Sequence, residues 1–348
     1  TAKNVSIAHT EAYTWYDDVV ISTEPIEMTS IPPSALSTLA DSMVAGEWQE
    51  LTTVGMTTAY CNTGGASGTI SSYGMEMVRD EEDRSSYYLG SDHGGNDYQG
   101  PNASYRFVKY SELDNEWTVM TAPPWVQGPV DYNDAHGYHL TAINSAGRKL
   151  YRMPYSSVDV HVYDLDTGAW SALPDIPDTP SVINTIAFFP ERNELLCSSS
   201  NGGVYSYNPV TNLWTNITPA TWNLSLSTTW NFSVYNSAKQ EVLFGGSLSS
   251  AGAAYSNNLW KYSAAGVFTQ LTDIPVAYRT YNGSGYTGVW TADPGGKYLV
   301  ITDPYNDLIA FPEHGDPGDP GFPGTPGTGR NMYSYDSTTQ VFASVVAI

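Results

Sequence analysis

The sequence predicts an all-β protein, and three observations carry that prediction. The composition favours strands and tight turns: aromatic residues make up 13% of the 348 residues, with 26 Tyr and 10 Trp beside 31 Gly and 22 Pro. Charged residues make up only 14%, whereas a helical protein usually carries more Lys, Glu and Arg. A pattern of two aromatic residues also recurs along the chain, which is typical of repeat architectures.

The recurring pattern is a Tyr followed by a second large aromatic residue. The second residue comes seven positions later in four segments and six positions later in one. Asp, Asn, Gly, Ser and Thr fill much of the space between, so each segment predicts a strand, a short turn and a strand that opens with the second aromatic. We expect these second aromatics at equivalent places on the last strand of each unit. The five pairs are Tyr110 and Trp117, Tyr163 and Trp170, Tyr207 and Trp214, Tyr262 and Phe268, and Tyr335 and Phe342.

Two more strands are predicted before most of these pairs. In the third unit, for example, residues 186–189 and 194–197 are apolar runs that precede Tyr207. Four strands in each repeated unit predict the blades of a β-propeller, because a single blade buries its faces only when blades stack around an axis. Six blades are preferred and five are the alternative. A sixth aromatic strand is expected at 46–51, and residues 13–22 could supply strands that the sixth blade lacks.

The repeated motif resembles the kelch repeat. Residues 162–170 (VYDLDTGAW) and 204–214 (VYSYNPVTNLW) are close to the kelch pattern, and residues 89–107 are similar to the first blade of bacterial kelch proteins related to the central domain of galactose oxidase. The resemblance covers residues 45–348. The chain departs from the kelch pattern at the pair of glycines, which is intact only in the fourth unit, directly after Phe244. The copper site of that oxidase needs two His, two Tyr and a Cys, and no such arrangement is found, so the resemblance implies a propeller without the oxidase site.

The chain is expected to divide into residues 1–44, an extended arm with a short helix, and residues 45–348, the propeller. Residues 33–44 begin with Pro and Ser and then place apolar residues at helical spacing, which predicts the helix. Residues 13–22 are apolar on both sides of a strand, so the arm should dock as a strand. It could close its own propeller or add to a neighbouring copy and form a homo-oligomer or filament. Residues 315–329 carry Gly-x-Pro triplets and predict a collagen-like surface loop.

One loop of the first complete unit holds the densest group of polar residues. Carboxylate and amide oxygens at this spacing could bind Ca²⁺, with Asp92 and Asp97 as the metal ligands. The same residues could instead bind a sugar, or only fix a Gly-rich loop through turn hydrogen bonds. Equivalent loops of adjacent blades lie side by side, so the start of the next unit is expected on the same face. The ligand-binding candidates are Asp92, His93, Asn96, Asp97, Tyr98, His136 and Tyr138.

The charge balance excludes some partners. The chain carries 36 acidic and 14 basic residues, a net charge of −22, which disfavours nucleic acid and anionic membrane surfaces. No apolar stretch is long enough to predict a membrane span. The two cysteines, Cys61 and Cys197, could form a disulfide or remain two buried thiols.

Two classes of function remain open. The first is a non-enzymatic extracellular protein that is secreted or lies on a cell or virion surface: an adhesin, a carbohydrate-binding propeller, or a subunit of an appendage. Its partner would be a glycan or a surface receptor. The alternative is a glycan-active enzyme, a lyase, hydrolase or oxidase, with its site at the propeller mouth. No catalytic motif with a defined spacing is found, so no catalytic residue is assigned.

Overall fold

The structure of the chain is a computed structural model. It describes residues 33–44, 49–56, 77–90, 106–121, 123–127, 139–154, 157–178, 185–199, 203–222, 232–245, 258–273, 289–292, 297–302 and 331–347. The chain divides into two units, Thr1–Pro33 and Ser34–Ile348. The helix α1 (Ala35–Ser42) belongs to the larger unit.

The described part of the larger unit forms five four-stranded sheets. The first sheet holds β1 (Val78–Asp80), β2 (Ser85–Gly90), β3 (Arg106–Ser111) and β4 (Glu116–Val119). The second holds β5 (Thr141–Asn144), β6 (Lys149–Arg152), β7 (His161–Asp164) and β8 (Trp170–Ala172). The third holds β9 (Thr185–Phe189), β10 (Glu194–Ser198), β11 (Val204–Asn208) and β12 (Leu213–Asn216). The fourth holds β13 (Phe232–Asn236), β14 (Glu241–Gly245), β15 (Leu259–Ser263) and β16 (Phe268–Leu271). The fifth holds β17 (Val289–Ala292), β18 (Tyr298–Thr302), β19 (Asn331–Asp336) and β20 (Val341–Ala347).

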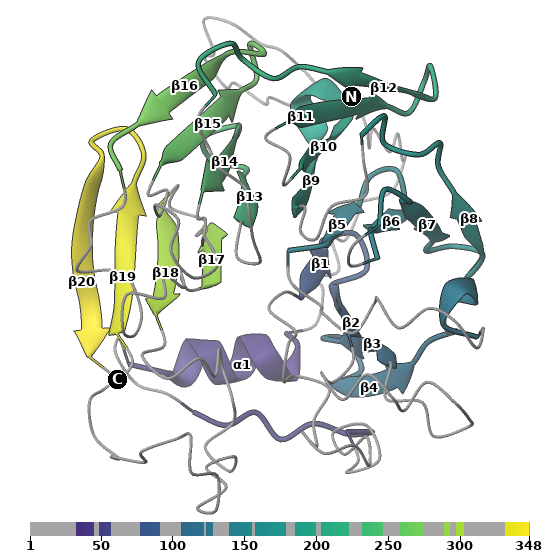
Figure 1. Cartoon of the computed structure of the whole chain (residues 1–348). Coiled ribbons are helices and arrows are strands. Elements are labelled where there is room, and N and C mark those ends of the chain that lie inside the picture. The colour runs from purple at the N-terminus through teal and green to yellow at the C-terminus, as the bar shows by residue number, and fades with distance from the viewer. Residues whose placement is uncertain are drawn as a thin grey trace, which may run out of the picture. The chain divides into compact units, whose positions relative to one another are not determined.

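The sheets follow one another like the blades of a propeller (Figure 1). Within each sheet the strands pair antiparallel in chain order. The first strands of successive sheets lie next to each other: β1 by β5, β5 by β9, β9 by β13, and β13 by β17. Hydrophobic clusters fill the space between successive sheets, as the one formed by Phe189, Leu196 and Phe244 does between the third and fourth. The predicted all-β, propeller-like arrangement is confirmed.

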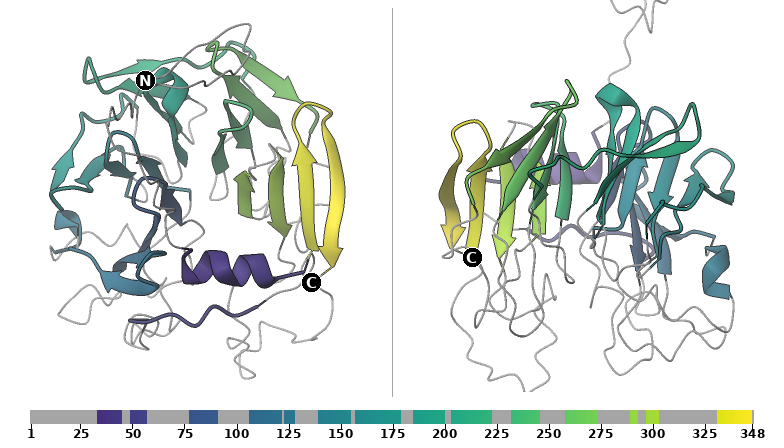
Figure 2. Two further views of the ribbon diagram at one scale, coloured as in Figure 1. Left: turned by 180° about the vertical axis from the view of Figure 1, so that it is seen from behind. Right: turned by 45° about the horizontal axis from the view of Figure 1, so that its top comes forward.

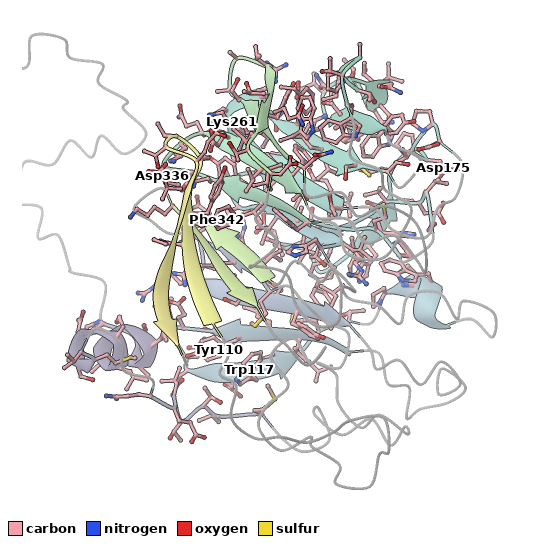
Figure 3. All side chains as sticks on the ribbon, turned by 60° about the vertical axis from the view of Figure 1, so that its left-hand side comes forward. Tyr110, Trp117, Asp175, Lys261, Asp336 and Phe342 are labelled. Atoms are coloured by element: carbon pink, nitrogen blue, oxygen red, sulfur yellow. The ribbon has the colours of Figure 1, made fainter. Side chains whose placement is uncertain are left out.

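The aromatic repeat occupies equivalent positions in all five sheets. Each Tyr lies on the third strand and pairs directly with an aromatic residue in the first or second position of the fourth strand. Tyr110 and Trp117 form one of these pairs (Figure 3), and Tyr335 and Phe342 form another. The ring centroids of the pairs are 4.4 to 5.3 Å apart. Contact across adjacent strands explains why the spacing in the sequence is so regular. The predicted position of these aromatics is confirmed.

The two ends of the sheets differ in their connections. Short turns join the first strand to the second and the third to the fourth, and all of them lie at one end, which we call the hairpin end; the right-hand view of Figure 2 draws these turns at the top. The opposite end, the loop end, receives the connections between the second and third strands and those that lead to the next sheet. Most of these connections are longer: residues 91–105 join β2 to β3, and residues 303–330 join β18 to β19.

Ion pairs tie neighbouring sheets together at the hairpin end. Arg148, in the β5–β6 turn, reaches the first sheet, where it pairs with Asp80 and approaches Asp83 at 3.7 Å. Between the fourth and fifth sheets, Lys239 donates to the carboxylate of Asp336 at 2.5 Å. These contacts join blades that are adjacent in the chain, so they stabilise the packing of one blade on the next.

The Lys239–Asp336 pair leads us to expect that the stability of the fold depends on pH. The Lys239 ammonium and the backbone N–H of Thr338 hold the pKa of Asp336 at about 2, below its ordinary value near 4. A carboxylate with a lowered pKa stabilises the fold above the unfolded-state pKa, and this contribution is lost as the pH falls through the folded-state pKa. We therefore expect the Lys239→Met variant to melt below the native protein at pH 7 and the difference to shrink between pH 4 and pH 2. Melting temperatures measured by circular dichroism check this, and a difference independent of pH would contradict it.

The described part of the predicted sixth aromatic strand, residues 49–51, shows no strand. Val54 makes only a single parallel bridge to Glu116. The N-cap Ser34 of α1 accepts a hydrogen bond from Arg84 at 3.0 Å, and α1 is drawn between the first and fifth sheets (Figures 1 and 2). The preferred count of six blades is therefore not supported. The count of five sheets refers only to the residues that the structure describes.

Residues 49–56 nevertheless contact the first sheet in the same way as the segments that lead into the second and third sheets contact those sheets. The indole N–H of Trp117 donates to Thr53 at 3.2 Å. In the next sheets, Trp170 donates to the carbonyl of Thr121, which follows β4, and Trp214 donates to that of Pro174, which follows β8. Each Trp thus fixes the segment that leads into its own blade. The Phe residues of the last two sheets lack this donor.

The predicted helix is confirmed: α1 begins after Ser34, whose side chain accepts a hydrogen bond from the N–H of Ser37. The strand at 13–22 and the collagen-like segment 315–329 lie outside the described residues. The docking of the arm and the surface position of the collagen-like loop therefore stay predictions.

Candidate functional site

The ligand-binding candidates from the sequence lie outside the described residues, but the strands that flank them are described. Asp92, His93, Asn96, Asp97 and Tyr98 lie between β2 and β3, and His136 and Tyr138 lie between β4 and β5. That both groups share one face stays a prediction, as does Ca²⁺ binding by Asp92 and Asp97.

The flanking strand ends all lie at the loop end of their sheets. In the first sheet, the N–H of Met120, just after β4, donates to the carbonyl of Phe107 at 2.8 Å, so the exit of β4 lies beside the start of β3. The first and second sheets point the same way, because the N–H of Glu81 donates to the Ser145 hydroxyl at 3.2 Å between their hairpin ends. The connections that carry the two candidate groups therefore both start at the loop end, at the junction of the first and second sheets.

A row of polar side chains crosses the second sheet at the same end. Thr141 pairs with Arg152, and Arg152 pairs with His161, on three adjacent strands. Directly paired residues of antiparallel strands project from the same face of a sheet. We call Thr141, Arg152 and His161 the polar row.

The centre of the polar row is a buried cation. Arg152 is 0% exposed and donates from Nη1 to the Thr141 hydroxyl at 3.2 Å. Among the described residues it is the one Lys or Arg that is buried. Arg152 also acts on Tyr88 of the first sheet. Burial raises the pKa of Tyr88, and the positive charge of Arg152 lowers it in part. A buried charge is costly unless its surroundings stabilise it, so this position is an unusual one for an arginine.

The outer end of the polar row is aromatic. The half-buried Trp125, in the short helix η1 (Pro124–Gln127), stacks on the half-buried His161 with ring centroids 3.9 Å apart and planes 23° apart. Trp125 also contacts Trp170 edge-on at 5.0 Å. The loop end of the second sheet thus combines a buried hydroxyl and guanidinium with a half-buried imidazole and indole.

The inner end of the row is extended by His139. This residue precedes β5, is buried, and lies with its ring 6.2 Å from that of Phe232 on β13. Because β5 and β13 belong to sheets that are not consecutive, this contact crosses the centre of the arrangement. His139 directly follows the sequence candidate Tyr138 in the chain and was not itself a candidate.

Sequence reasoning missed the polar row itself. None of its three residues was among the candidates from the sequence. One feature of the sequence could have indicated the site: Arg152 is a charged residue within an otherwise apolar strand. Arginine is rarely buried without a specific environment. That the two side chains are adjacent depends on the register of β6 and β7.

Other candidate sites gain no support from the described residues. Cys197 is buried, and burial raises the pKa of its thiol. Cys61 lies outside the described part, so a disulfide and two buried thiols both stay predictions. Within the described ranges no group of three or more His, Cys, Asp or Glu could hold a metal ion. In that same part of the chain, no helix is long and apolar enough to span a membrane.

Comparison with known proteins shows no family. No protein-family model matches the chain, and no curated protein sequence matches it. Among solved structures, it is similar to one described as "Crystal structure of Nidogen/Laminin Complex", with a TM-score of 0.47, 12% identity, and coverage of 79% of this chain and 80% of that one. It is also similar to "Streptogramin B lyase structure", with a TM-score of 0.44, 10% identity, and coverage of 77% of this chain and 66% of that one.

Proposed function

We propose that this chain is a kelch-like propeller that binds a carbohydrate outside the cell, without catalysing a reaction, and that the binding site lies at the loop end where the first and second sheets meet. The observation that carries the proposal is the difference between the two ends of the sheets. The hairpin end has only short turns in the described part, whereas the loop end receives the long connections. Loops held by a rigid scaffold are where binding residues concentrate.

The residues at this junction support a sugar as the ligand. The half-buried His161 of the polar row offers an imidazole, and the stacked Trp125 and His161 offer an aromatic surface. Binding sites for small ligands typically combine apolar and aromatic walls with a few fixed polar groups. The sequence candidates at 92–98 and 136–138 belong to connections whose flanking strands, β2, β3, β4 and β5, belong to the first and second sheets.

The test is a glycan array probed with the purified protein, with and without a chelator to reveal any need for Ca²⁺. We expect binding to a restricted set of glycans and at least a tenfold loss of affinity in the double variant Asp92→Ala, His93→Ala. The matched control is Asp114→Ala in the β3–β4 turn, which removes an exposed acid of the same sheet at the hairpin end and should keep the native affinity.

Two outcomes would overturn the proposal. An array without any bound glycan would contradict carbohydrate binding. Equal losses in the Asp114 control and the loop variant would contradict the location of the site. Incubating the bound glycan with the protein and analysing it by mass spectrometry tests the absence of catalysis, because cleaved or oxidised products would make the chain an enzyme.

A further inference from the structure

We propose that the outer edge of β20 binds a second copy of this chain, so that two copies pair their β20 strands and join their fifth sheets into one continuous sheet. Among the residues that the structure describes, β20 pairs with β19 alone. Figure 1 draws β20 at the outer side of the fifth sheet. The proposed sugar site belongs to the first and second sheets, so the two proposals do not depend on each other.

The length of β20 distinguishes it from the outer strands of the other sheets. It has seven residues, whereas β4, β12 and β16 have four each and β8 has three. An edge strand carries a row of unpaired N–H and C=O groups and is a template for pairing with another chain. Proteins limit this pairing with short edge strands, and β20 is the one outer strand of the five described sheets that is not short.

The composition of β20 also lacks the usual protection of an edge. Its sequence, VFASVVA, holds no charged residue and no Pro, which are the residues that most often keep edge strands from pairing. Val341 is 56% exposed, and Ala343 is exposed as well. One protective feature is present, because the register with β19 shifts between Met332 and Tyr333, as it does at a β-bulge. We therefore place the contact at Val341–Ser344, where the pairing is regular.

A second copy of the chain fits this edge because the strand is complementary to itself. Identical edges that meet about a two-fold axis form an antiparallel pair, so the same residues serve both sides. The chain has a net charge of −22, and two copies repel each other wherever acidic surfaces meet. An uncharged strand avoids that repulsion at the contact, and uncharged runs of high β propensity are the ones that pair with their own kind.

The antiparallel pairing determines how the two copies face. β20 runs from the hairpin end to the loop end of its sheet, since the short turn from β19 lies at the hairpin end. In the second copy the strand runs the opposite way, so the loop ends of the two copies point in opposite directions. The dimer would then hold its two sugar sites on opposite sides and join two glycan-bearing surfaces. This consequence alone rests on the proposed function.

Sedimentation velocity of the full chain over a range of concentrations tests the interface. We expect a reversible equilibrium between monomer and dimer in the micromolar range. The dimer should become tighter as salt rises, because salt screens the repulsion between the copies. Hydrogen–deuterium exchange locates the contact: the backbone amides of 341–347 should exchange more slowly at concentrations where the dimer forms than in the dilute monomer.

Charge variants then test the position of the contact. We expect Ala343→Asp to weaken the dimer by about tenfold or more, because the pairing brings two like charges together. The matched control is Thr269→Asp, since Thr269 is exposed and follows Phe268 on β16 as Ala343 follows Phe342 on β20; it should change the affinity by less than about twofold. A mixture of Ala343→Asp and Ala343→Lys should form a heterodimer, which shows that both variants are folded.

Three results would overturn the proposal. The first is a chain that stays monomeric while the amides of 341–347 exchange freely. The second is a monomer in which these amides are protected at every concentration, which would show that a segment of the same chain covers the edge. The third is a dimer that Ala343→Asp and Thr269→Asp weaken equally, which would place the interface elsewhere. The glycan array decides the proposed function separately, whichever of these results is found.

Discussion

Replacing Arg148 with methionine is expected to lower the free energy of unfolding by about 3–5 kcal/mol, the usual cost of leaving a buried charge without its partner. Asp80 is 0% exposed and pairs with Arg148 from the neighbouring sheet. Arg148 also donates from Nε to Asp166 at 2.9 Å. Removing it therefore strands a buried carboxylate and breaks the contact between the first two blades. Urea unfolding followed by circular dichroism measures the change.

The control is the double variant Arg148→Met, Asp80→Asn, which removes the buried charge as well as its partner. It should recover part of the lost stability, because a buried amide costs less to bury than an unpaired carboxylate. A loss below about 1 kcal/mol in the single variant, which is the range of exposed ion pairs, would contradict the interpretation of Arg148 as the link between these blades.

Replacing Gly245 with alanine is expected to lower the free energy of unfolding by about 1–3 kcal/mol, the usual cost of forcing an extra methyl group into a packed core. Gly245 ends β14 and pairs with Phe232 on one side and Leu259 on the other, both buried. A Cβ atom at this position would lie 2.8 Å from Cζ of Phe232 and would also overlap Leu259. Thermal and urea unfolding of the variant check this value.

The matched control is Gly147→Ala in the exposed β5–β6 turn. There the added Cβ meets the side chain of Asn144, with Cγ at 2.8 Å, but this side chain is only half-buried and can move. We expect a change within about 0.5 kcal/mol, as for most surface substitutions. Equal effects at Gly245 and Gly147 would show that the core position is not the cause.

Gly245 also shows that a sequence motif can be recognised without the packing that explains it. The glycine pair after Phe244 was recognised in the sequence as a feature of kelch-like repeats. The reason for the first glycine is visible only in three dimensions, because Phe232 and Leu259 come from strands on either side of β14. The same holds for Arg148, whose partner Asp80 lies 68 positions earlier in the chain.

The sequence by itself determined the four-stranded unit and the place of its aromatics. Tyr207 and Trp214, for example, are separated by one tight turn, and the local spacing of such a hairpin fixes which residues face each other. It also determined the helix α1, because Ser34 and the apolar spacing after it are local signals. The number of sheets was not determined in this way. A sixth aromatic strand was expected before the first blade, but the described chain there makes a single bridge to Glu116 instead.

Only the tertiary structure decided which polar residues meet. Thr141, Arg152 and His161 come from three strands whose register places them in one row, and Trp125 reaches His161 from the connection between two sheets. Such contacts depend on how sheets and loops pack, and residue order does not encode them locally. Local turns and alternating burial are set by neighbours in the chain, so a pattern reveals them; a site assembled from several strands is set by the packing of the whole unit, so it emerges only when the fold is known.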